Sequence, residues 1–100
     1  MTHIVIYESA GSFAENKDLA IEIRESSIKP ALGNGEEVVL DFDGVTLATQ
    51  SFIHALISDP IRLYGPDVLD RMSFKNCNET VKTLVTVVCD YMQDSFGIDQ

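Results

Sequence analysis

The sequence predicts an α/β fold in which a small, mostly parallel sheet of three to five strands alternates with helices. Short β-branched segments are separated by segments with helical spacing, and a nearly continuous apolar segment lies near the middle of the chain. A regular apolar stripe marks the C-terminal region as a helix. With 100 residues, 45% of them hydrophobic, we expect one domain spanning residues 1–100.

The first part of the chain predicts one strand and one helix. His3–Tyr7 is β-branched and aromatic, which favours a strand, and Ser9–Ser12 is typical of a turn. A helix is expected from Asn16, and Pro30 either kinks it or opens a separate last turn before Gly33–Gly35 end it. The helical face consists of Leu19, Ala20, Ile23 and Ala31.

The middle of the chain predicts a buried central strand followed by a helix. Glu37–Phe42 reads as a parallel strand covered on both faces, in the middle of the sheet. Asp43-Gly44 is typical of a turn, and a short Val45–Ala48 segment follows. Thr49 is a good N-cap for the second helix, which we expect to end before Pro60.

The last part predicts a strand and the clearest helix. Arg62–Asp67 contains Gly and Pro and reads as a loop or turn, and Leu69–Phe74 alternates like a strand. Asn76 and Glu79 resemble a capping box, and Gly97 is expected just past the helix end. The stripe of the helix consists of Val81, Leu84, Val85, Val88, Cys89 and Met92.

Composition narrows the classes of function. The net charge is -9, and the 7 basic residues are scattered singly, which argues against nucleic acid as a partner. No segment approaches the roughly 18 apolar residues of a membrane span, so we expect a cytoplasmic protein without membrane contact. The 2 cysteines and 2 histidines lack metal-ligand spacing, which predicts no metal and no cofactor.

One alternative is enzymatic. The strand that leads into Asp41-Phe42-Asp43-Gly44 resembles the first motif of haloacid-dehalogenase-type phosphatases. That resemblance implies a magnesium-dependent phosphatase with Asp41 as nucleophile and Asp43 as general acid. The chemistry also needs a lysine and an acidic pair that holds magnesium, and the acidic pair is missing from the sequence.

The same segment supports a different interpretation. Leu40-Asp41-Phe42, followed by Gly44-Val45-Thr46 and a polar run that opens a helix, resembles the central signature of STAS domains, the fold of anti-sigma-factor antagonists. From about Ser12 to Met92 the chain is similar to the STAS-like domain family of unknown function. The further motifs that carry this similarity are Pro30-Ala31-Leu32, Ser51-Phe52 and Phe74-x-Asn76.

The resemblance implies a bacterial, non-catalytic regulatory module that docks a histidine-kinase-like ATPase or an anti-sigma-type kinase. The edge implied for docking consists of Asp43, Gly44, Thr49, Gln50, Ser51 and Phe52. In phosphoregulated members the helix begins with Asp, Ser, Ser, Gly. Here Thr49 stands in place of that Asp, Gln50 in place of the phosphorylated Ser, and Phe52 in place of Gly. Phosphorylation of this chain would therefore have to take place on Thr49 or Ser51. Binding of a nucleotide or lipid is suggested only by analogy with other STAS domains.

Overall fold

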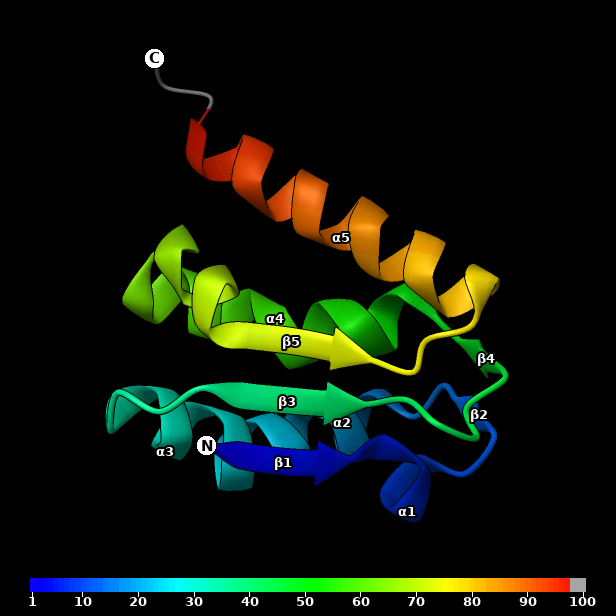
Figure 1. The fold of residues 1–100 in the computed structure, drawn as a ribbon. Helices are drawn as coiled ribbons and strands as arrows, with labels where there is room; N and C mark the ends of the chain where they lie inside the picture. Colours follow the sequence, from blue (N-terminus) through cyan, green and yellow to red (C-terminus); the bar gives the residue numbers. More distant parts are fainter. Residues whose placement is uncertain (98–100) are drawn as a thin grey trace.

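The computed structural model describes residues 1–97 and confirms the α/β class (Figure 1). Its strands are β1 (Thr2–Val5), β2 (Phe13–Ala14), β3 (Val38–Asp41), β4 (Leu47–Ala48) and β5 (Met72–Lys75). Its α-helices are α1 (Ile6–Ala10), α2 (Lys17–Ile23), α3 (Lys29–Gly33), α4 (Gln50–Tyr64) and α5 (Glu79–Gly97). A π-helical turn η1 (Arg24–Ile28) joins α2 to α3, and a 3-10 helix η2 (Pro66–Arg71) precedes β5. Within residues 1–97, no helix is both long and apolar enough to span a membrane.

Within residues 1–97 all the strand pairs are parallel, and β3 is the middle strand of the main sheet, as predicted. The main sheet has the order β1-β3-β5, and β2 pairs with β4 in a second, two-stranded sheet. Helices α2, α3 and α4 lie behind the main sheet in Figure 1, where Val38 and Leu40 of β3 join the hydrophobic core. Val39 points to the opposite face, between exposed His3 and Ser73, which are its register partners.

The first strand is shorter than predicted. It ends at Val5, and Ile6–Ala10 form a helical turn instead of continuing the strand. The amide of Gly11 donates to the carbonyl of Tyr7 at 2.8 Å and closes this turn. Ile6 is fully buried there, so packing into the core outweighs the strand propensity of the local sequence.

Pro30 is accommodated in a last helical turn, α3, which continues directly from η1 and is therefore not separate from the preceding helix, as one of the two predicted outcomes had it. It lies in the first turn of α3, where a missing N–H is tolerated. The junction with α2 is continuous, because the amide of Lys29 donates to the carbonyl of Arg24 across a widened π-helical turn.

The prediction that the second helix ends before Pro60 was wrong. Helix α4 runs through Pro60 to Tyr64, so the first residues of the predicted Arg62–Asp67 loop are helical. Ile57 and Ile61 on either side of Pro60 are fully buried, and this burial outweighs the lost backbone hydrogen bond. The helix ends at Gly65, whose φ is +87°.

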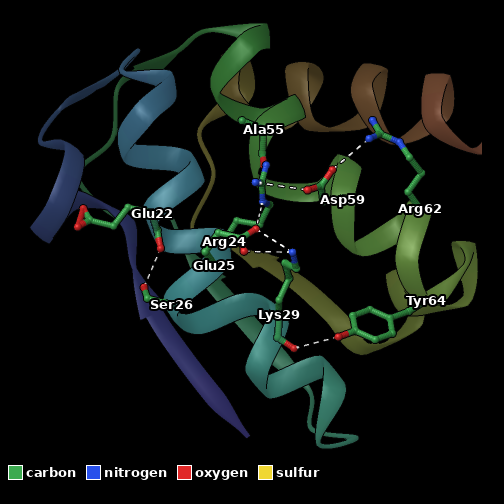
Figure 2. Close-up of polar contacts among 9 residues, drawn as sticks. All are labelled: Glu22, Arg24, Glu25, Ser26, Lys29, Ala55, Asp59, Arg62 and Tyr64. Carbon is green, nitrogen blue, oxygen red and sulfur yellow. Dashed lines mark hydrogen bonds and ion pairs between the residues drawn. The ribbon is translucent and has the colours of Figure 1, made fainter.

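An ion-pair network fastens the α2–η1–α3 segment to α4 (Figure 2). The guanidinium of Arg24 donates to the carbonyl of Ala55 at 3.3 Å and lies 3.3 Å from the carboxylate of Asp59. Arg24 also contacts Glu25, which accepts from Lys29, and these two bonds hold the pKa of Glu25 below its usual value. The network contains none of the residues of the predicted docking edge, and it holds the helices together.

The C-terminal elements agree with the predicted stripe but not with the predicted cap. Val81, Val85, Val88 and Met92 are buried against the core, and β5 starts three residues later than expected. The capping box at Asn76 was wrong, because the Oδ1 atom of Asn78 accepts from the amide of Val81 at 2.8 Å. Helix α5 also includes Gly97 instead of ending before it.

Candidate functional site

Asp41, the last residue of β3, is hydrogen-bonded to a side chain of β1 and to a side chain just after β5. Its Oδ1 atom accepts from the side-chain amide of Asn76, after β5, and from the backbone N–H of Asp43, each at 2.9 Å. Its Oδ2 atom lies 3.2 Å from Nε2 of His3 on β1. The pKa of Asp41 is held below its usual value. The largest cause is the hydrogen bond from Asn76, followed by the hydrogen bond from the Asp43 amide and then by the one with His3.

These contacts do not suit a magnesium site. Magnesium prefers oxygen ligands, whereas the neighbours of Asp41 are two N–H donors and an imidazole that already occupy both carboxylate oxygens. Asp43 is exposed, and it contributes its backbone N–H to Asp41. In the part of the chain that the structure describes, no three His, Cys, Asp or Glu side chains are grouped so that they could hold a metal ion.

Gly44 is required by the turn that follows β3. Its φ is +89°, a conformation that favours glycine. A Cβ atom at this position would lie 2.8 Å from Cδ1 of Tyr7, closer than carbon atoms can approach without movement. The turn therefore packs directly against the aromatic ring of Tyr7 in α1.

The start of α4 is anchored by two of the predicted residues. Thr49 is the N-cap, as predicted, and its hydroxyl accepts from the amide of Phe52 at 3.2 Å. The amide of Thr49 donates to the carbonyl of Ala14 in β2 at 2.9 Å. Phe52 is fully buried in the core, so its predicted place on the docking edge is wrong: the side chain has no surface to offer a partner.

Gln50 and Ser51 are exposed and line a groove of about 390 Å³. The other lining residues come from three helices and are Lys17 of α2, His54 of α4, and Val88 and Tyr91 of α5. We call these six residues the α4 groove. It combines hydrogen-bonding groups, one cationic side chain and an aromatic ring that is 60% exposed.

The structure thus divides the predicted edge into two parts. Asp43 and Gly44 lie in the turn beside Tyr7, whereas Gln50 and Ser51 face the α4 groove, with β4 between them in the chain. Sequence reasoning missed Lys17, His54 and Tyr91 as members of one site. They are far apart in the sequence, and the packing of α2 and α5 against α4 places them around one groove.

Comparison with known proteins places the chain in a family. No curated protein and no solved structure matches it. A family model described as "STAS-like domain of unknown function (DUF4325)" matches residues 20–82. This range runs from α2 through the first turn of α5 and includes Asp41, Thr49 and Ser51. The chain therefore belongs to the family of STAS-like domains of unknown function.

Proposed function

We propose that this chain is a non-catalytic regulatory module that docks a protein partner of the histidine-kinase-like ATPase type through the α4 groove. The observation that carries the proposal is the start of α4. Thr49 and Phe52 fix the backbone through a cap and core packing, and Gln50 and Ser51 between them remain exposed. A rigid backbone that presents free polar side chains lowers the entropy cost of binding.

The choice of partner is suggested by the resemblance of Leu40-Asp41-Phe42 and Gly44-Val45-Thr46 to the signature of regulatory STAS domains, and the family match covers this segment. The groove supports a protein contact, since Tyr91 supplies exposed aromatic surface and Gln50, Ser51 and His54 supply hydrogen-bonding groups. These are the elements of a small interface with an aromatic anchor.

We further propose Ser51, and not Thr49, as the residue whose phosphorylation would control docking. The hydroxyl of Thr49 is engaged as the N-cap, whereas Ser51 is exposed in the first turn of a 15-residue helix. A phosphate there would be stabilised by the helix N-terminus and by Lys17 in the same groove. Its added charge would change the groove that a partner contacts.

Docking is tested by titrating purified chain with a purified ATPase of the histidine-kinase fold, chosen from those encoded beside the gene, and measuring Kd by calorimetry. Ser51→Asp should weaken binding at least about tenfold, because a charge enters the groove. Ser73→Asp is the matched control, since Ser73 is exposed on the open face of the main sheet. Equal Kd values for the two variants and for wild type would remove the α4 groove from the interface.

Phosphorylation is tested separately by incubation with the same ATPase and ATP, followed by mass spectrometry. Incorporation of one phosphate that Ser51→Ala abolishes, and that Thr49→Ser leaves in place, is the expected result. Phosphate on Thr49 in the wild-type chain would contradict the assignment.

The phosphatase alternative remains a separate prediction with its own test. The carboxylate of Asp41 is engaged in hydrogen bonds and is therefore not free to act as a nucleophile. We expect no hydrolysis of p-nitrophenyl phosphate in the presence of magnesium. Activity that disappears in Asp41→Asn would overturn the docking proposal in favour of an enzyme.

A further inference from the structure

Three large apolar side chains are exposed at the carboxyl end of the sheet, outside the α4 groove. Phe13 of β2 and Leu47 of β4 are register partners, 46% and 48% exposed. Tyr7 of α1 is 48% exposed and packs against Gly44, in the turn that leads to β4. We call these three residues the apolar patch. Elements α1, β2 and β4 lie at the right-hand end of Figure 1.

The backbone beneath the patch is firmly held. The carbonyl of Ser12 accepts from the amides of Thr46 and Leu47 at 2.8 and 3.1 Å. Asn78, at the start of α5, donates to the carbonyl of Thr46 at 2.9 Å. Ala14 and Ala48, the inner residues of this strand pair, pack on the core, so Phe13 and Leu47 are turned outward by the pleat. Their exposure is therefore fixed by the fold.

Acidic residues flank the patch in the chain. Glu8 follows Tyr7, Glu15 lies two residues after Phe13, and Asp43 precedes Gly44, and all three are exposed. Segments 7–16 and 43–48 contain no Lys or Arg, within a chain whose net charge is -9. The nearest basic residue along the chain, Lys17, lines the α4 groove. A second copy of this chain would bring like charges together, whereas a basic partner surface would be attracted.

We infer that the apolar patch is the central contact for a protein partner whose own surface carries an apolar anchor surrounded by Lys and Arg. The inference rests on the proposed docking function and adds a second contact area, together with the charge of the partner. Apolar side chains held at fixed positions are the kind of contact at which a few residues, buried on binding, carry most of the binding energy. The acidic residues that flank the patch in the chain would speed association with a basic partner and make binding sensitive to salt.

The test uses a partner identified by photo-crosslinking from Leu47 in native cells and then purified, with Kd measured by calorimetry. Phe13→Ser and Leu47→Ser should each raise Kd at least about tenfold. Raising the salt concentration should weaken the wild-type complex, and the double variant Glu15→Gln/Asp43→Asn should reduce this salt dependence. Unfolding in urea checks that the variants remain folded.

Leu63→Ser is the matched control, since Leu63 is 59% exposed near the C-terminal end of α4, far along that helix from Gln50. If Phe13→Ser and Leu47→Ser bind like this control while Ser51→Asp fails to bind, the patch is refuted and the groove stands. If Ser51→Asp binds normally and the patch variants fail, the groove is refuted and the patch stands. Crosslinking of no partner, or of a second copy of the chain, overturns the inference.

Discussion

Replacing Gly44 with alanine should destabilise the fold more than the same change at Gly35. Both glycines have a positive φ, +89° at Gly44 and +78° at Gly35, so alanine is strained at either position. The surroundings differ. A Cβ atom at Gly44 would lie 2.8 Å from the ring of Tyr7, whereas no neighbouring atom lies within 4 Å of a Cβ atom at Gly35.

The magnitude follows from two contributions. A positive φ costs an alanine about 1–2 kcal/mol, and this part is common to both variants. At Gly44 the contact involves Cγ and Cδ1 of Tyr7, at the base of the ring, so the whole ring must rotate. Forcing a side chain about 30° away from its preferred rotamer costs about 0.5–1.5 kcal/mol. Gly44→Ala should therefore lower the free energy of unfolding by about 1.5–3.5 kcal/mol.

Urea unfolding followed by circular dichroism measures both variants. The Tyr7→Ala and Tyr7→Ala/Gly44→Ala chains complete a double-mutant cycle, in which removal of the ring should recover the part of the loss that is due to the contact. The reasoning fails if Gly44→Ala and Gly35→Ala lose the same free energy and the cycle shows no coupling between positions 7 and 44.

The remaining predictions concern caps, pH and thiols. Thr49→Ala and Asn78→Ala should each lower the free energy of unfolding by about 1 kcal/mol in urea, because each removes an N-cap. The lowered pKa of Asp41 means that its ionised form stabilises the fold above the ordinary value of 3.8, and that this contribution is lost as the pH falls through the lowered pKa. The stability difference between wild type and Asp41→Asn should therefore shrink in urea titrations at increasingly acidic pH. Burial raises the pKa of Cys77 and Cys89, so both thiols should react with an aromatic disulfide reagent more slowly than free cysteine.

Each of these has its own control. Thr49→Ser keeps an oxygen acceptor and should retain most of the stability that Thr49→Ala loses. A difference between wild type and Asp41→Asn that grows on acidification would reverse the sign argued for Asp41. Reaction of either cysteine at the rate of the free amino acid in the folded chain would contradict its burial.

Several features of this protein were predictable because their signals are local. The stripe around Val81 and Val88 repeats with the helical period, and the apolar run at Val38–Leu40 suits a central strand; both predictions were confirmed. Thr49 could be predicted as an N-cap because the hydroxyl of a threonine before a helix can accept from an amide three residues later. In the structure it accepts from the amide of Phe52. Each of these depends on neighbours within a few residues.

Other features depend on contacts between distant segments. Helix α4 passes through Pro60 because buried isoleucines flank it, and nothing within the helix sequence shows that burial. The cap of α5 is Asn78 and not Asn76, because Asn76 adopts a φ of +59° and bonds Asp41. Two asparagines separated by one residue look alike in sequence, and the tertiary contact with β3 distinguishes them.

The sequence by itself determined the α/β class, the central position of β3 and the helix start at Thr49, since periodicity and capping act over short distances. The tertiary structure decided which side chains meet. It buried Phe52, brought Lys17 and Tyr91 to the groove beside Ser51, and left Phe13 and Leu47 side by side on the surface. Which side chains become neighbours depends on how whole helices and strands pack together. The free energy of that packing is the sum of many contacts between residues that are distant in the chain.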